Sequence, residues 1–106
     1  MADLKLGLLL STPPSHPSVE TVVQLAQAAL RRGVEVYLYL IDEGVKTAAD
    51  RRYLSLIDAG VKMSVCAYGC QQYGVLTATV DSRVSLSGLV VLSVIIDGCD
   101  RFLAFT

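Results

Sequence analysis

Two cysteines four positions apart, Cys66 and Cys70, are the residues of this 106-residue chain best suited to chemistry. Cys66 ends the apolar stretch Val-Lys-Met-Ser-Val-Cys, which has the composition of a strand. If residues 67–73 are helical, the two thiols lie on nearly the same face, one turn apart. A thiol at a helix N-terminus meets the positive end of the helix dipole, which favours the nucleophilic thiolate. We therefore predict thiol chemistry at Cys66, with Cys70 as a resolving thiol.

A plainer interpretation of both cysteines stays open, because free cysteines are commonly small buried core residues. The third cysteine, Cys99, lies at the entry to the last expected strand, and we expect it in the core at the opposite edge of the sheet. Cys66, Cys70 and His16 could hold zinc only with a further ligand, and their cysteine spacing is wider than the common one. We expect no metal ion.

The loop that follows the first expected strand contains all three prolines and the only histidine. Ligands of parallel α/β sheets lie beyond the carboxyl ends of the strands, where this loop and the cysteine segment share an edge. The histidine could act as a general base or as a cation beside a thiolate, or be an exposed loop residue. The hydroxyls of the loop could bind substrate or cap the next helix. The expected substrate-binding residues are Ser11, Thr12, His16, Tyr68 and Gly69.

Alternating strand and helix patterns predict an α/β fold. Strands are expected at 4–10, 34–41, 61–66 and 101–105, with a short one at 77–80, and helices from 17 or 18 to 32, at 48–59 and at 67–73. Right-handed crossovers between such strands build a mostly parallel sheet, here a five-stranded one in a three-layer sandwich. No glycine-rich phosphate loop follows the first strand, so we expect no nucleotide cofactor.

Residues 86–96 are ambiguous from the sequence alone. Their β-branched side chains favour a strand, whereas their length and the following Asp97-Gly98 favour a helix. We predict a helix, because 101–105 already supplies a final strand. A helix that is apolar nearly all round must be covered on both sides, which points to a homo-oligomer.

Composition sets the broad class of the protein. The hydrophobic fraction is 53%, only 18% of residues are charged and the net charge is −1. The length fits one domain, residues 1–106, and the apolar excess fits a subunit interface. There is no basic run for nucleic acid and no stretch long enough to span a bilayer. An odd number of cysteines argues against a secreted disulfide framework, so we expect a cytoplasmic protein.

The chain resembles the DsrE/DsrF-like family, which includes the TusD-type sulfur relay proteins. The resemblance runs along the whole chain and is carried by Arg31-Arg32-Gly33-Val34, residues 60–66, Leu86-Ser87-Gly88-Leu89 and residues 99–105. It implies a flavodoxin-like or DsrE-like fold, a helix over the ambiguous segment, and assembly into dimers, trimers or hexamers.

The resemblance also implies a function. In sulfur-transferring members, a cysteine just after the third strand carries sulfane sulfur as a persulfide, and Cys66 matches that position. Cys70 matches no general feature of the family. Many members have an arginine before the glycine downstream of the cysteine, where this chain has Gln71-Gln72-Tyr73-Gly74. Arg83 is the candidate to supply the missing cation.

We therefore expect a sulfur carrier or sulfurtransferase-like protein that exchanges sulfur between a donor protein and an acceptor protein. Two alternatives from other classes stay open. One is a thiol-disulfide redox or sensing module that uses Cys66 and Cys70. The other is a non-catalytic oligomeric binding protein, in which neither thiol reacts.

Overall fold

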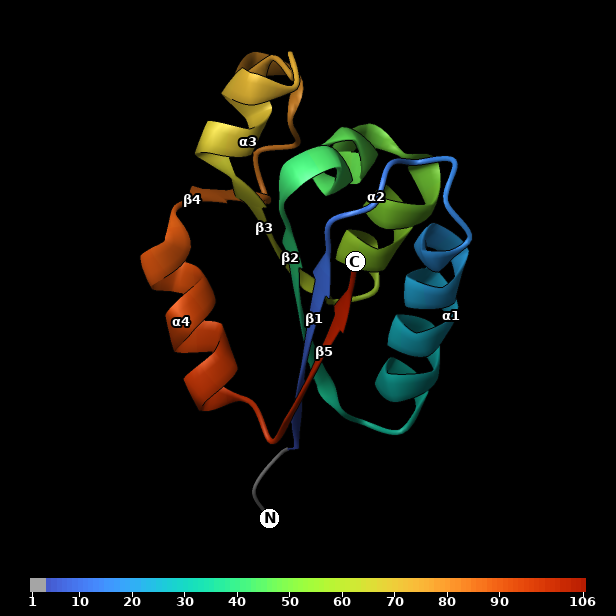
Figure 1. Cartoon of the computed structure of the whole chain (residues 1–106). Helices are drawn as coiled ribbons and strands as arrows, with labels where there is room; N and C mark the ends of the chain where they lie inside the picture. The colour runs from blue at the N-terminus through green and yellow to red at the C-terminus, as the bar shows by residue number, and fades with distance from the viewer. Residues whose placement is uncertain (1–3) are drawn as a thin grey trace.

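A five-stranded parallel sheet forms the middle layer of the computed structural model, which describes residues 4–106 (Figure 1). Residues 1–3 of the expected domain lie outside this range. The strands, in the spatial order β4-β3-β2-β1-β5, are β1 (Lys5–Leu10), β2 (Glu35–Leu40), β3 (Lys62–Cys66), β4 (Ser85–Ser87) and β5 (Arg101–Phe105). The helices are α1 (Ser18–Arg31), α2 (Arg51–Asp58), α3 (Ala67–Gln72) and α4 (Leu89–Gly98), with short 3₁₀ helices η1 (Asp42–Ala49) and η2 (Thr77–Thr79).

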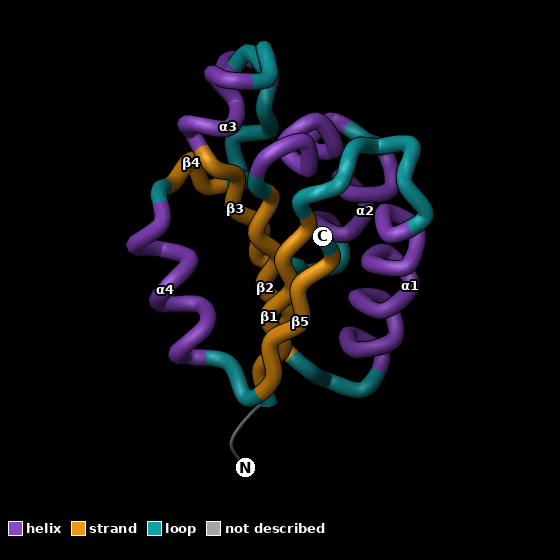
Figure 2. The backbone as a smooth tube through the Cα atoms, viewed as in Figure 1, coloured by secondary structure: helices purple, strands orange, loops and turns teal. Residues whose placement is uncertain are grey.

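Helices cover both faces of the sheet, which confirms the expected three layers (Figures 1 and 2). From β1 to β3 the chain moves steadily in one direction across the sheet, and right-handed crossovers place α1 and α2 on one face. From β4 the chain returns across the sheet to β5, beyond β1, so the same handedness places α4 on the other face. The strand order thus changes direction between β1 and β5, whereas the flavodoxin order 2-1-3-4-5 changes direction between β1 and β3.

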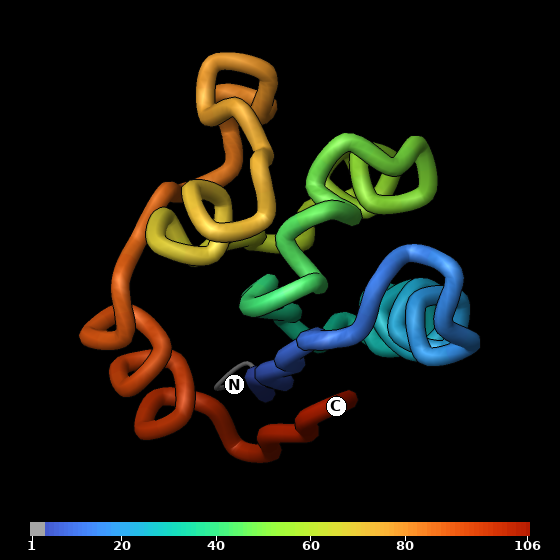
Figure 3. The backbone as a smooth tube through the Cα atoms, turned by 45° about the horizontal axis from the view of Figure 1, so that its top comes forward, coloured from blue at the N-terminus to red at the C-terminus, as the bar shows by residue number. Residues whose placement is uncertain are grey.

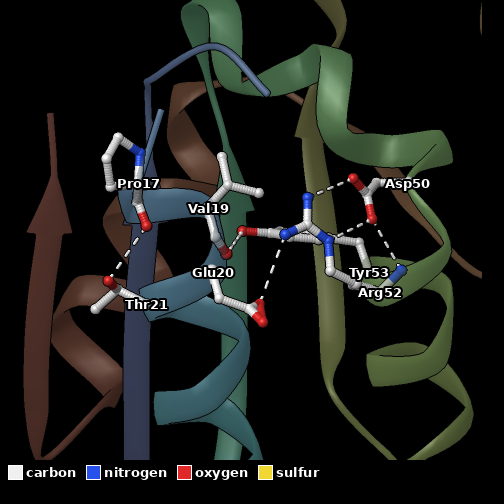
Figure 4. A network of polar contacts seen from close by, with 7 residues as sticks. All are labelled: Pro17, Val19, Glu20, Thr21, Asp50, Arg52 and Tyr53. Atoms are coloured by element: carbon white, nitrogen blue, oxygen red, sulfur yellow. Dashed lines mark hydrogen bonds and ion pairs between the residues drawn. The ribbon is translucent and has the colours of Figure 1, made fainter. Parts of the chain in front are cut away.

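The layer of α1 and α2 holds the main core, and polar contacts join its two helices (Figure 4). The buried Tyr53 hydroxyl donates a 2.9 Å hydrogen bond to the Val19 carbonyl. Asp50 caps α2 by accepting the Arg52 amide N–H at 2.8 Å. The hydrogen bond from the Arg52 guanidinium keeps the pKa of Asp50 below its ordinary value, although burial opposes that shift. These contacts fix the helix that follows η1.

Three elements differ from the sequence-based expectation. The helix expected at 48–59 is divided, because Asp50 has extended backbone and begins a new helix after η1. Residues 77–80 were expected to form a strand, but 77–79 form a 3₁₀ turn. The fifth strand is instead 85–87, which pairs with residues 64–66 of β3. It overlaps the first two residues of the helix that was predicted at 86–96. Three residues are too few for a local pattern, so only pairing with β3 reveals this strand.

One side of α4 is exposed apolar surface. Ile95 is buried against the sheet, whereas Val90 is 79% exposed and Val94 is 65% exposed. A cavity of about 520 Å³ lies where α4 meets β3 and β4, toward the amino ends of the strands. The helix predicted for this segment is confirmed, with the apolar outer side that the sequence led us to expect. Among residues 4–106, no helix combines the length and the apolar character needed to cross a membrane.

Candidate functional site

Cys66 stands where a strand becomes a helix. It is the last residue of β3, pairs with Ser87 of β4, and serves as the N-cap of α3. Its Sγ accepts a hydrogen bond from the Gly69 amide N–H at 3.4 Å. Serine, threonine or aspartate oxygen usually accepts from this third amide of a helix, so a sulfur here occupies the position of a capping oxygen. Backbone pairing on both sides of β3 and the cap together fix the sulfur in place.

Cys66 lines a pocket of about 370 Å³. The pocket lies at the carboxyl edge of the sheet, as expected for a ligand site of a parallel α/β fold. Its walls come from three connections: residues 41 and 42 after β2, residues 66–69 from β3 into α3, and residues 87–89 from β4 into α4. Cys66 itself is 7% exposed, so a reactant must enter the pocket to reach it.

Two glycines allow η1 to pack closely beside this pocket. A Cβ on Gly44 would overlap the backbone carbonyl of Leu10 at the end of β1. A Cβ on Gly69 would lie 2.9 Å from Val45 Cγ1 and 3.5 Å from the Cβ of Cys66. Both distances are below or near the limit of ordinary contact, so larger residues would push η1 away. The close packing brings Asp42 to the pocket wall.

Asp42 lines the Cys66 pocket and is also exposed to solvent. Its φ of 51° lies in the left-handed region, which aspartate tolerates better than most residues. This conformation turns the chain sharply between β2 and η1. The sequence signal for this role is its place directly after a buried strand, at the edge where ligands bind.

Tyr39 is a second residue that sequence reasoning did not assign to the site. It is fully buried, and its hydroxyl donates to the Gly88 carbonyl at 3.0 Å and, more weakly, to the Ser87 carbonyl at 3.4 Å. Burial, the negative charge of a Cys66 thiolate and a hydrogen bond to that sulfur raise the pKa of Tyr39 to about 12. The alternation of tyrosine with aliphatic residues along β2 indicates a sheet covered on both faces and gives no local signal for a site.

Cys70 is buried within α3 rather than open to the pocket. Its exposed fraction is 0%, and burial, with a smaller contribution from the charge of Cys66, raises the pKa of its thiol. The helix ends as expected at Gly74, whose φ is +69°. The two cysteines therefore differ: Cys66 lines the pocket, whereas Cys70 is fully buried and is not among the residues that line it.

The structure brings Tyr68 and Gly69 to Cys66, whereas Ser11, Thr12 and His16 lie in the loop after β1. Strand β2 and η1 lie between that loop and α3 (Figure 3). The Ser11 amide N–H donates to the Phe105 carbonyl, and His16 Nδ1 accepts from the Ser18 amide at 3.1 Å. Thr12 is buried, and its Oγ1 has no hydrogen-bond partner within the described part of the chain. Both loops lie at the carboxyl edge, as expected, but only one forms the pocket of Cys66.

Arg83, the candidate substitute cation, lies away from Cys66. Its guanidinium pairs with Asp58 at 2.7 Å and with Asp81 at 3.0 Å, beside the cavity next to α4. Cys99 lies at the opposite edge, beside Gly7 and Lys5, as the sequence predicted, but it is half-buried against the core rather than within it. Within residues 4–106, no three His, Cys, Asp or Glu side chains gather closely enough to hold a metal ion.

Comparisons with known proteins agree with this architecture. The sequence model of the DsrE/DsrF-like family matches residues 5–105. No curated protein matches the chain by sequence. The ychN protein of E. coli has the same fold, with a TM-score of 0.83 at 17% identity over 98% of this chain and 100% of that one.

Two further solved structures share the fold, and both are titled as proteins of unknown function. The one from Bacteroides thetaiotaomicron has a TM-score of 0.74 at 19% identity, over 95% of this chain and 94% of its own. The one from Methanobacterium thermoautotrophicum has a TM-score of 0.78 at 13% identity, over 95% of this chain and 99% of its own. At these identities the likeness shows the fold alone.

Proposed function

The chain belongs to the DsrE/DsrF-like family, and from this premise we propose that it is a sulfur carrier, which holds sulfane sulfur as a persulfide on Cys66 and passes it to a partner protein. The observation that carries the proposal is the position of Cys66, which lines a pocket and whose sulfur accepts the Gly69 amide N–H at the N-terminus of α3. A role like that of the TusD-type relay subunits, in a reducing cytoplasm, is part of the same proposal.

The transfer is a thiol–persulfide exchange, and its balance needs no external oxidant. The Cys66 thiolate attacks the outer sulfur of a donor persulfide, R–S–SH. A new S–S bond forms on Cys66 while the S–S bond of the donor breaks, and the donor leaves as the thiolate R–S⁻. The proton remains on the transferred sulfur. Delivery is the same exchange, with an acceptor thiolate attacking the outer sulfur held on Cys66.

The pocket supplies what such an exchange requires. The Gly69 N–H donates to the sulfur, and a hydrogen bond to an anionic acceptor is stronger than one to a neutral acceptor. The limited exposure of Cys66 protects a bound persulfide from reaction with small thiols in solution. A donor and an acceptor protein must each present sulfur within the pocket, so both are proposed as partners.

We propose further that copies of this chain associate through α4. Val90 and Val94 are large apolar side chains that are mostly exposed on its outer side. An apolar helix face is stabilised by covering it, and a second copy offers the same surface in return.

A thiol-disulfide module is the second candidate function. Cys66 is the N-cap of α3 and Cys70 lies one turn further along the same helix, so the two cysteines are close. Joining them as a disulfide removes two electrons and two protons, which an external disulfide would accept. The inward position of Cys70 requires the first turn of α3 to open, so the carrier function is the better supported one.

The direct test is mass spectrometry of the protein after incubation with glutathione persulfide. The expected result is one labile sulfur on wild type and on the Cys70→Ser and Cys99→Ser variants, and none on Cys66→Ser. Loading of the Cys66→Ser variant to the wild-type level would reject the carrier function. A loss of two hydrogens that links Cys66 and Cys70 would support the redox module, and slow labelling without either change would support a binding protein.

A further inference from the structure

Tyr39 joins the reactive sulfur to a distant part of the chain. Its hydroxyl donates to the Gly88 carbonyl at 3.0 Å, and Gly88 is the N-cap of α4. The side chain thus passes from β2 beneath the pocket to the junction of β4 and α4. Residues 87–89 of that junction form one wall of the Cys66 pocket.

Strand pairing places the Tyr39 hydroxyl beside Cys66. Tyr39 pairs with Ser64 of β3, and Cys66 lies two residues further along the same strand, on the same face. Parallel strands about 4.8 Å apart, with a rise of about 3.3 Å per residue, put such diagonal neighbours about 8 Å apart, within reach of a tyrosine side chain. The hydroxyl also contacts the carbonyl of Ser87, the residue that pairs with Cys66. Both the sulfur and the Gly88 carbonyl are therefore acceptors close to one donor.

The Gly88 carbonyl can lose this donor at little cost. It also accepts the Val91 amide N–H at 3.2 Å, in the first turn of α4. A carbonyl oxygen has two lone pairs, and keeping one hydrogen bond avoids the penalty of a buried unpaired group. An anionic sulfur, by contrast, is a stronger acceptor than a neutral carbonyl.

We propose that the Tyr39 hydroxyl moves between two acceptors, donating to the Gly88 carbonyl when Cys66 is a neutral thiol and to the Cys66 sulfur when that sulfur is an anion. The junction between β4 and α4 then loses a hydrogen bond whenever the sulfur is charged. In this way Tyr39 reports the state of Cys66 to the start of α4. The part of the proposal that concerns a persulfide anion rests on the carrier function.

The hydroxyl keeps its proton over the working range of pH, since burial and the charge of Cys66 hold the pKa of Tyr39 at about 12. Other titratable groups face the same region. They are Asp42 from the β2–η1 connection, and Tyr68 and Cys70 from α3. Variants of these groups separate their effects from that of Tyr39.

The first test compares Tyr39→Phe with a matched control, Tyr53→Phe. Both tyrosines are fully buried and donate to a backbone carbonyl, but Tyr53 does so on the other face of the sheet. The readout is the rate of Cys66 alkylation by iodoacetamide against pH, followed by peptide mass. Loss of a charge-assisted hydrogen bond lowers the thiolate population about tenfold, and higher intrinsic nucleophilicity offsets about half of this on a logarithmic scale.

The expected rate for Tyr39→Phe near neutral pH is therefore about threefold below wild type, with the profile displaced to higher pH. The Tyr53→Phe variant is expected to keep the wild-type rate. Equal rates for wild type and Tyr39→Phe would overturn the proposal.

A second test uses wild type, so that it stands even if Tyr39→Phe fails to fold. The NMR shift of the Tyr39 ring carbon that bears the hydroxyl, and the exchange rate of the Val91 amide, are followed as Cys66 ionises. Both should change in wild type and in Cys70→Ser and Asp42→Asn, and neither should change in Cys66→Ser. An unchanged Tyr39 signal in wild type, or the same change in Cys66→Ser, would reject the switch.

Failure of this proposal is distinguishable from failure of the carrier function, because alkylation needs no sulfur donor. Slower alkylation of Cys66 in Tyr39→Phe, together with no sulfur loading of wild type, would support the Tyr39 switch and reject the carrier function. A protein that loads sulfur on Cys66 but shows equal alkylation rates keeps the carrier function and loses the switch.

Discussion

The Gly69 amide donates a hydrogen bond to the Cys66 sulfur across 3.4 Å, while its absent side chain leaves room for Val45 on η1. One residue thus serves both the Cys66 sulfur and the packing that surrounds it. The first turn of α3 can approach η1 only because position 69 has no Cβ. The geometry of the sulfur therefore depends on the packing between two helices.

Replacing Gly69 with alanine should disturb both features. The new Cβ would lie 2.9 Å from Val45 Cγ1, and overpacking of this kind costs about 1–3 kcal/mol. Chemical denaturation should show that loss, and Cys66 should alkylate at an altered rate because its N–H donor moves. Gly98→Ala is the control, since among the described residues nothing lies within 4 Å of a Cβ built there. Equal stability of the two variants would contradict the packing argument.

Removing the charge of Asp42 should admit anions more readily to the pocket. The Asp42 carboxylate lines the same pocket as Cys66 and repels an anionic reactant. For Asp42→Asn, the ratio of the Cys66 alkylation rates by iodoacetate and neutral iodoacetamide should rise about twofold in low salt. Glu43→Gln, which removes the neighbouring exposed charge, is the matched control. A ratio that rises equally in both variants would show that the charge of Asp42 repels anions from the pocket no more than the neighbouring charge of Glu43 does.

Cys70 should be the slowest of the three thiols to label. Its pKa is raised and it is fully buried, so at a given pH it offers less thiolate and less access. Its alkylation should therefore become measurable only at higher pH than that of Cys66, or after partial unfolding. Peptide mass spectrometry over a pH series measures this order. Labelling of Cys70 as fast as Cys66 at neutral pH would mean that α3 opens readily.

Asp50 should contribute to stability in a manner that depends on pH. Loss of an N-cap acceptor costs about 1 kcal/mol, so Asp50→Ala should unfold at lower denaturant concentration, while Asp50→Asn keeps an acceptor and should lose less. Because the pKa of Asp50 is lowered in the folded protein, the contribution of its charge is complete above the unfolded value of about 3.9. It disappears as pH falls through the lower folded value. The gap between wild type and Asp50→Asn should thus close in acid, and a gap that persists there would exclude the charge as its cause.

A charge on the outer side of α4 should separate the proposed oligomer. Val90 is 79% exposed in one copy, so Val90→Glu removes little contact within the chain but places a charge in the proposed interface. Light scattering after size exclusion should show a smaller species for this variant. Leu76→Glu, at another exposed apolar residue, should leave the assembly intact. Wild type that is monomeric at all concentrations would reject the interface.

The sequence was sufficient for the elements with strong local patterns and for the place of Cys66. The apolar runs of β1 and β2, the helical spacing of α1 and the glycine that ends α3 are all local signals. Tyr39 and Asp42 were missed because their roles arise from the pairing of β2 with β3, which no local pattern records. The short strand β4 was missed for the same reason. Ser11 and His16 were grouped with Cys66 because the loops after β1 and β3 both lie at the carboxyl edge of the sheet. Strand β2 and η1 separate these two loops along that edge.

Cys66 ends a strand that is paired on both sides, by β2 and by β4. Many group carriers use a swinging arm, a long flexible tether that visits donor and acceptor in turn. A sulfur mounted on the central sheet has no such reach, and in the proposed relay it stays where the backbone holds it. The partners must therefore move to Cys66. Each must bring a cysteine on a segment narrow enough to enter a pocket of about 370 Å³. Recognition of the partner's shape then becomes inseparable from the transfer itself.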